Sequence, residues 1–167
     1  MKRKGISVAG LLLFLTIAGY SQVKNGAFRL LLNTLLQHTA PETTVAEIVR
    51  DSSKIVFLDA REPREFTISH LHGAIPAGYQ TFTLKDLPEL DKSRRIVVYC
   101  SVGYRSEKIA EKLIVAGFTN VSNLYGGIFE WVNQGLPVYN EHGPTQQVHA
   151  YDRTWGVWLE RGEKIYD

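Results

Sequence analysis

The single cysteine of the chain lies where a thiol can act as a nucleophile. An apolar run, Ile96 to Tyr99, leads directly into Cys100, and a short loop, 101–105, follows. Beyond the loop, apolar residues at helical spacing predict a helix over 106–116. We therefore expect Cys100 between a buried strand and a helix N-terminus, where N–H groups and the helix dipole favour negative charge. Such surroundings lower a thiol pKa from about 8.5 to roughly 3.5–7.5, so the pattern predicts a thiolate.

The residues of the loop weigh against an inert cysteine. An isolated cysteine at a strand end is usually a small buried apolar residue. Here Gly103 allows a tight curl that turns N–H groups inward, and Arg105 offers a planar guanidinium that can hold an anion by two hydrogen bonds. Together with Ser106, these residues indicate a site built around the sulfur.

The elements that would position Cys100 alternate between helices and strands. Helices are predicted over 27–39, from a capping box at Thr44–Glu47, over 63–68 with Phe66 facing inward, and from Ile128 to Gly135. Continuous apolar runs at 55–58 and 96–99 predict buried strands, and a shorter strand is predicted at 121–124. Buried strands separated by helices predict an α/β fold, a parallel sheet flanked by helices on both faces.

The two ends of the chain differ from its middle. Lys2, Arg3 and Lys4 precede an apolar stretch, 6–18, and small residues follow, which predicts a signal peptide over 1–21 and export to the periplasm or cell envelope. An uncleaved N-terminal anchor is the alternative. Residues 22–42 are interpreted as an N-terminal helical segment and 43–140 as the main domain. In the aromatic stretch 141–167, Trp155, Val157 and Leu159 alternate with Gly156 and Trp158, which indicates a strand, and the stretch is interpreted as a small C-terminal hairpin.

Length and charge narrow the class of protein. The 167 residues leave 146 after cleavage, enough for one domain with its own core. Removal of the three N-terminal basic residues leaves 16 basic against 17 acidic side chains, and no basic stripe is visible, which argues against nucleic acid as a partner. A single cysteine cannot form an internal disulfide, so in an oxidising compartment it is either buried and inert or there to react.

Several ordered blocks together resemble the rhodanese-like family of sulfurtransferases, over roughly 43–138. The blocks are 58–62 (Leu-Asp-Ala-Arg-Glu) with Glu65-Phe66, His70-Leu71 with Gly73-Ala74, 100–106 (Cys-Ser-Val-Gly-Tyr-Arg-Ser), and 124–127 (Leu-Tyr-Gly-Gly) with Trp131, Gly135 and Pro137. Two positions depart from the family pattern. Ser69 replaces a usual glycine, and the segment 75–78 after Ala74 is altered.

The resemblance implies a sulfurtransferase that needs no cofactor. Cys100 would carry a persulfide taken from a small sulfur donor such as thiosulfate and pass the sulfur to a thiol or protein acceptor. The loop would cradle the sulfur and the donor anion through Ser101, Val102, Gly103, Tyr104, Arg105 and Ser106. We expect a monomer, with the C-terminal extension as a possible surface for a partner protein.

Three residues outside the loop are expected to support it. Asp59 and Arg61 would brace the loop or each other, and a satisfied buried ion pair and a direct contact with the ligand are equally good interpretations of the two residues. His70 is expected to be a hydrogen-bonded structural residue. The neighbouring histidines 70 and 72 lack further ligands, so no metal site is predicted.

Two other functions stay open at this stage. Rhodanese-like phosphatases and arsenate reductases place one more residue between cysteine and arginine, whereas the span from Cys100 to Arg105 is six residues inclusive, which favours sulfur. A partner-binding module is the second alternative, with the cysteine as a redox sensor or persulfide carrier and the aromatic extension as its contact surface.

Overall fold

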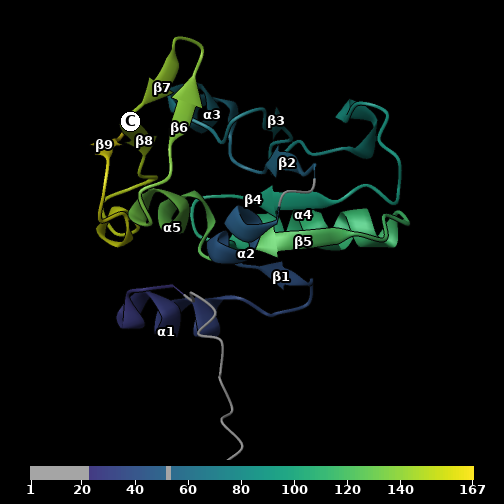
Figure 1. Ribbon diagram of the computed structural model, residues 1–167, viewed down its shortest axis with the longest axis horizontal. Helices are drawn as coiled ribbons and strands as arrows, with labels where there is room; N and C mark the ends of the chain where they lie inside the picture. Colours follow the sequence, from purple (N-terminus) through teal and green to yellow (C-terminus); the bar gives the residue numbers. More distant parts are fainter. Residues whose placement is uncertain (1–22, 52–53) are drawn as a thin grey trace, which may run out of the picture.

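The chain folds around a five-stranded parallel sheet in the order β1-β5-β4-β2-β3. The computed structural model describes residues 23–51 and 54–167 (Figure 1). The predicted α/β fold is thereby confirmed. The strands are β1 (Glu42–Thr43), β2 (Val56–Asp59), β3 (Ile75–Pro76), β4 (Ile96–Tyr99) and β5 (Val121–Leu124).

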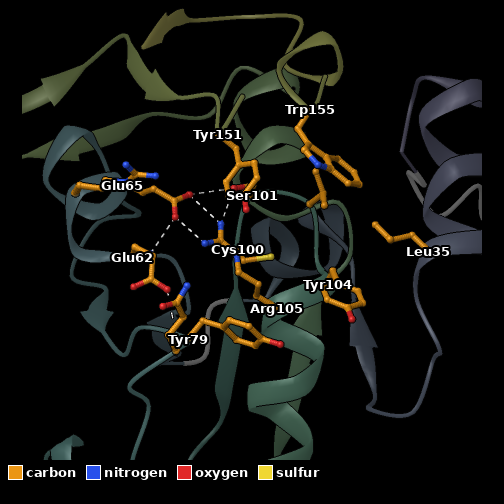
Figure 2. Close-up of a pocket in the computed structure, with 13 residues that line it drawn as sticks. Leu35, Glu62, Glu65, Tyr79, Cys100, Ser101, Tyr104, Arg105, Tyr151 and Trp155 are labelled. Carbon is orange, nitrogen blue, oxygen red and sulfur yellow. Dashed lines mark hydrogen bonds and ion pairs between the residues drawn. The ribbon is translucent and has the colours of Figure 1, made fainter. Parts of the chain in front are cut away.

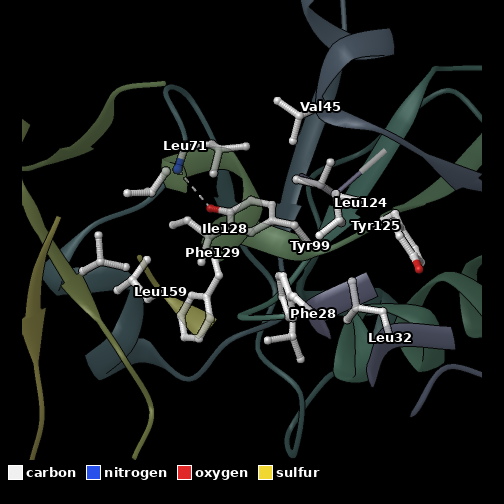
Figure 3. Packing of buried hydrophobic residues seen from close by; sticks show 14 of the residues in the cluster. Phe28, Leu32, Val45, Leu71, Tyr99, Leu124, Tyr125, Ile128, Phe129 and Leu159 are labelled. Atoms are coloured by element: carbon white, nitrogen blue, oxygen red, sulfur yellow. Dashed lines mark hydrogen bonds between the residues drawn. The ribbon is translucent and has the colours of Figure 1, made fainter. Parts of the chain in front are cut away.

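Helices cover both faces of this sheet, and alternate residues of β4 belong to two separate apolar clusters, one on each face. Val97 and Tyr99 pack with α1 (Gly26–Leu35), α2 (Val45–Arg50) and α5 (Gly127–Asn133). Ile96 and Val98 pack with α4 (Tyr104–Val115) on the opposite face. All four β4 residues are buried, so the continuous apolar run follows from burial on two sides. Figure 3 shows the first cluster, in which the buried Tyr99 hydroxyl accepts the Leu71 N–H.

Local signals explain where most helices begin. Thr44 and Glu47 form the predicted capping box of α2. α3 (Pro63–Ile68) has the predicted bounds, but the prediction that Phe66 faces inward holds only in part. Phe66 is half-buried against His70, whereas Glu65 is the α3 side chain that is fully buried.

The first helix ends earlier than its apolar pattern predicts. α1 stops at Leu35 rather than 39, because Leu36 adopts an extended conformation. The backbone N–H groups of Gln37 and Thr39 then donate to the buried carboxylate of Glu107, 70 and 68 residues away in sequence. A distant side chain therefore takes the donors that a longer helix would have used.

The C-terminal residues form extra strands, but not in the predicted pairing. β6 (Val138–Asn140) and β7 (Gly143–Thr145) form an antiparallel hairpin, while β8 (Gln147–His149) and β9 (Glu163–Ile165) pair in parallel. The strand expected around 155–159 is wrong, since Gly156–Trp158 is the 3-10 helix η2. Asp152 nucleates this turn, because its carboxylate accepts the Thr154 and Trp155 N–H groups. A second 3-10 helix, η1, spans Leu84–Asp86.

The C-terminal strands are packed onto the main domain. Val148, Ala150 and Leu159 belong to the same apolar cluster as α1 and α5, and Trp158 stacks on Phe28 at 5.4 Å between ring centroids. These elements lie on the side of the molecule to which the carboxyl ends of β4 and β5 point (Figure 1). The extension is therefore placed beside the end of the sheet where Cys100 follows β4.

Among residues 23–51 and 54–167, no helix is both long and apolar enough to cross a membrane. The predicted signal peptide, 1–21, lies outside the described residues.

Candidate active site

Cys100 lies at the base of a pocket of about 370 Å³ at the carboxyl end of β4. Its side chain is 1% exposed. Figure 2 shows that the walls come from four parts of the chain: α1, the region of α3 and the loop after β3, the cysteine loop with α4, and the C-terminal extension. The lining residues are Leu35, Glu62, Arg64, Glu65, Tyr79, Gln80, Cys100, Ser101, Val102, Tyr104, Arg105, Tyr151 and Trp155.

The loop after Cys100 curls back onto the sulfur. Gly103 adopts a φ of +121°, which side chains rarely allow, and its N–H points at Cys100 Sγ with an N···S distance of 3.1 Å. Gly103 is also the residue that precedes α4, a helix of 12 residues. The sulfur is therefore beside a helix N-terminus, as the sequence predicted, where negative charge is favoured.

A second helix holds the loop from the other side. The N–H groups of Ile128 and Phe129, in the first turn of α5, donate to the carbonyl oxygens of Cys100 and Ser101 at 2.9 and 3.1 Å. This approach requires glycine at 127, because a Cβ there would lie 2.3 Å from the Cys100 carbonyl oxygen. Gly127, the first residue of α5, thus lets two backbone segments meet.

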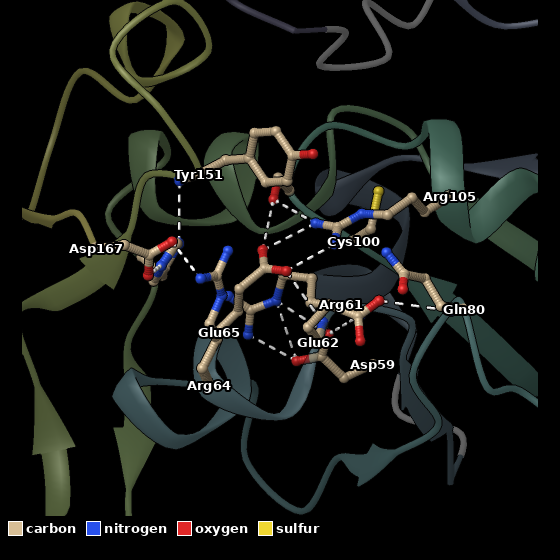
Figure 4. Close-up of polar contacts among 12 residues, drawn as sticks. Asp59, Arg61, Glu62, Arg64, Glu65, Gln80, Cys100, Arg105, Tyr151 and Asp167 are labelled. Atoms are coloured by element: carbon tan, nitrogen blue, oxygen red, sulfur yellow. Dashed lines mark hydrogen bonds and ion pairs between the residues drawn. The ribbon is translucent and has the colours of Figure 1, made fainter.

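Arg105 lines the pocket, but its guanidinium is already paired. Its two terminal nitrogens donate to the two carboxylate oxygens of Glu65 at 2.6 and 2.8 Å, and one of them also donates to Ser101 Oγ at 3.0 Å (Figure 4). Burial alone would raise the pKa of Glu65, but the hydrogen bonds and charge of Arg105 lower it to about 2. Burial alone would likewise lower the pKa of Arg105, and Glu65 and Cys100 raise it instead. Both groups are charged at neutral pH.

Ser106 supports the loop from beneath and does not reach the pocket. It is fully buried, and its Oγ lies 2.7 Å from Asn123 Oδ1 and 3.1 Å from the Gly103 carbonyl oxygen. Asn123 Nδ2 donates to the same carbonyl at 3.0 Å. Of the six loop residues predicted to bind substrate, four line the pocket, and Gly103 and Ser106 do not. Gly103 instead directs its backbone N–H at the Cys100 sulfur.

Asp59 and Arg61 form a buried ion pair beside the site rather than a wall of it. Both side chains are 0% exposed, and the Nη2–Oδ2 distance is 2.6 Å. Arg61 also donates to the Ser69 carbonyl at 2.5 Å. The Asp59 carbonyl accepts the N–H groups of Ala77 and Gly78, which fixes the segment leading to Tyr79 in the pocket wall. The main chain of Asp59 and the side chain of Arg61 thus hold the segments after β3 and α3 beside the pocket.

His70 lies away from the sulfur. Its ring stacks on Phe66 at 4.0 Å, its Nδ1 is 3.1 Å from the Phe66 carbonyl oxygen, and its backbone pairs with Tyr139. In the described part of the chain, no group of three His, Cys, Asp or Glu residues is arranged to hold a metal ion.

Several pocket residues were not predicted as site residues. Glu65 was noted only within a sequence block, and Tyr79 gave no signal at all. Tyr151 covers Arg105, with its ring centroid 5.2 Å from the guanidinium carbon. Trp155 lines the pocket, whereas Trp158 is partly buried and stacks on Phe28 against the apolar cluster. Tyr151 adopts a positive φ of 68° in the turn that directs its side chain to the pocket, and no residue pattern in the sequence indicates this turn.

A parallel α/β sheet with a cysteine loop between a central strand and a helix N-terminus defines the class of protein. The chain belongs to the rhodanese-like family, since the family described as Rhodanese-like domain matches residues 43–134, more than half of the chain.

Known proteins agree with this assignment over part of their length. The tRNA uridine(34) hydroxylase of Erwinia tasmaniensis is 35% identical over 97 residues, which are 53% of this chain and 28% of that protein. A rhodanese-related protein of Thermoplasma volcanium superposes with a TM-score of 0.54 and 26% identity, covering 60% of this chain and 99% of the other. The BH2092 protein of Bacillus halodurans gives 0.56 and 25%, covering 70% and 86%. The chain thus spans little more than a quarter of its curated relative.

Proposed function

We propose that the protein is a sulfurtransferase that carries a sulfane sulfur as a persulfide on Cys100. One observation carries the proposal. The only cysteine of the chain lines a pocket at the carboxyl end of the central strand, with the Gly103 N–H directed at its sulfur. Membership of the rhodanese-like family agrees with this chemistry.

The reaction proceeds in two displacements. The Cys100 thiolate attacks the outer sulfur of the donor, the donor's S–S bond breaks, and the leaving group departs with the electron pair, as sulfite when the donor is thiosulfate. A thiophilic acceptor then attacks the outer sulfur of the persulfide, and the Cys100 thiolate is released. Division into two steps makes each transfer easier.

The residues around the sulfur stabilise negative charge in both steps. The Gly103 N–H donates to Sγ, and the charge of Arg105 interacts with Cys100. Both groups are held before any substrate arrives, Gly103 by the start of α4 and Arg105 by Glu65, so little reorganisation accompanies charge development. No general base is needed, because the attacking thiolate, the persulfide and the groups that leave in the two steps are all anions, so no proton has to be removed.

An assay with thiosulfate as donor and cyanide as acceptor tests the proposal. We expect thiocyanate formation by the wild type and only the uncatalysed rate with Cys100→Ser. Matched rates for the two proteins would refute the proposed role of Cys100.

The phosphatase alternative is less compatible with the site. A bound phosphate ester would share the Arg105 guanidinium with the Glu65 carboxylate, which accepts from both terminal nitrogens at 2.6 and 2.8 Å and would repel the anionic ester. Hydrolysis of para-nitrophenyl phosphate that disappears in Cys100→Ser would favour the phosphatase function over sulfur transfer.

The binding-module alternative loses part of its proposed surface. Trp158 stacks on Phe28, so this aromatic side chain is engaged within the protein itself, and Trp155 faces the Cys100 pocket. A thiol or protein acceptor, a monomeric state and export to the periplasm or cell envelope remain predictions from the sequence.

A further inference from the structure

The charges lining the pocket cancel, which is unfavourable for a doubly charged donor. Two lining side chains are acidic, Glu62 and Glu65, and two are basic, Arg64 and Arg105. Arg105 is paired with Glu65, and Arg64 forms an ion pair with Asp167. With Cys100 as a thiolate, a second negative charge on the donor is repelled in a confined space. Among the described residues that line the pocket, each cationic side chain is paired with a carboxylate, so none is left unpaired for the second charge of a dianion.

Apart from Gln80 and Ser101, the remaining walls are apolar and aromatic. Leu35 from α1, Tyr104 from α4 and Tyr79 line one part of the pocket, and Tyr151 and Trp155 from the C-terminal extension line another. Figure 2 shows these side chains arranged around the Cys100 sulfur. Aromatic rings facing a pocket favour apolar or aromatic groups, through area burial and ring stacking.

The C-terminal wall is a built feature rather than a chance contact. The Tyr151 N–H donates to His149 Nδ1 at 3.1 Å, and His149 Nε2 lies 3.0 Å from Asp167 Oδ1. His149 is buried, and Asp167 also pairs with Arg64. Asp152 caps the turn that carries Trp155, at 2.9 Å from its N–H. Both rings are therefore held in place by hydrogen bonds of their own backbone.

We propose that the physiological donor of sulfur is an organic molecule, with an apolar or aromatic group and at most one negative charge, rather than thiosulfate. A thiosulfonate or an organic persulfide has this chemistry. This inference rests on the proposed sulfurtransferase function. With a thiosulfonate, the Cys100 thiolate takes the outer sulfur, the bond between the two donor sulfurs breaks, and a sulfinate leaves with the electron pair.

Three donors separate the contribution of charge from that of the aromatic wall. Methanethiosulfonate and thiosulfate differ in charge, while benzenethiosulfonate and methanethiosulfonate differ in the aromatic group. We measure kcat/KM for each with cyanide as acceptor, divided by the rate of its direct reaction with cyanide. The expected order is benzenethiosulfonate, methanethiosulfonate, thiosulfate, with about tenfold between neighbours, the ratio that 1.4 kcal/mol produces.

Trp155→Ala tests the wall, and Tyr166→Ala is its matched control in the same extension outside the pocket. We expect the benzene-to-methane ratio to fall about tenfold in Trp155→Ala and to stay unchanged in Tyr166→Ala. Because both donors meet the same preparation, partial unfolding leaves the ratio unaffected. Inhibition of the wild type by benzenesulfinate at about tenfold lower concentration than by methanesulfinate is the second measurement.

The outcomes distinguish this inference from the function on which it rests. Two outcomes overturn the proposed substrate class and leave the sulfurtransferase function standing. One is turnover that depends on Cys100 but is fastest with thiosulfate, and the other is a benzene-to-methane ratio that Trp155→Ala leaves unchanged. Absence of Cys100-dependent turnover with all three donors overturns the function, and the substrate class with it.

Discussion

Replacement of Glu65 by glutamine removes the charge that pairs with Arg105 beside the catalytic sulfur. The Glu65 side chain is 1% exposed, and its carboxylate accepts from both terminal nitrogens of Arg105 and from the Glu62 N–H. Glutamine has nearly the same shape, so the change isolates the charge. Arg105, 13% exposed, is left without its anionic partner.

The pKa of Glu65 sets the size of the effect. Against a value of 4.5 for the free side chain, burial and the interactions with Arg105 leave it at about 2 in the folded protein. A depressed carboxyl pKa stabilises the folded state above the unfolded pKa, and this contribution is lost as pH falls through the folded pKa. At about 1.4 kcal/mol per pKa unit, the shift contributes roughly 3 kcal/mol to the free energy of unfolding at pH 7. At pH 3 this contribution is smaller by roughly 2 kcal/mol.

Urea unfolding followed by tryptophan fluorescence measures this difference at both pH values. We expect Glu65→Gln to be less stable than the wild type by about 3 kcal/mol at pH 7, with the gap closing on acidification because glutamine does not titrate. A variant as stable as the wild type at pH 7, or a gap that is the same at pH 7 and pH 3, would refute the argument that this ion pair holds the site together.

Three further substitutions test how the loop and its supports are held. Gly127→Ala places a Cβ 2.3 Å from the Cys100 carbonyl oxygen, so we expect slower persulfide formation in a stopped-flow assay; an unchanged rate would mean that the α5 contact is dispensable. Ser106→Ala removes a buried hydroxyl between two oxygen acceptors, and differential scanning calorimetry should show a loss of about 1–3 kcal/mol. Trp158→Ala removes a partly buried ring stacked on Phe28 and is expected to cost about 1–3 kcal/mol in urea unfolding, a prediction that an unchanged stability would contradict.

Features encoded by local patterns were predictable from the sequence. The buried run 96–99, the capping box at Thr44 and the bounds of α3 depend on neighbours in the chain, and the structure has them where they were expected. The cysteine loop was recognisable for the same reason, since Gly103 and Arg105 are close to Cys100 in sequence.

Features set by distant contacts were not predictable in this way. The end of α1 depends on Glu107, and the pairing of the Arg105 guanidinium depends on Glu65, 40 residues earlier. A single buried carboxylate leaves no periodic pattern to detect. Tyr151 and Trp155 reach the pocket through the fold of the C-terminal extension, whose alternating apolar residues indicate a strand where the Asp152 cap makes a 3-10 turn.

Intact-mass spectrometry of wild type and Cys100→Ser after brief exposure to thiosulfate or benzenethiosulfonate tests the central claim most directly. We predict one added sulfur on the wild type alone, removed by cyanide. An unchanged mass of folded wild-type protein with both donors, or an added sulfur that persists in Cys100→Ser, would contradict the assignment of Cys100 as the sulfur carrier.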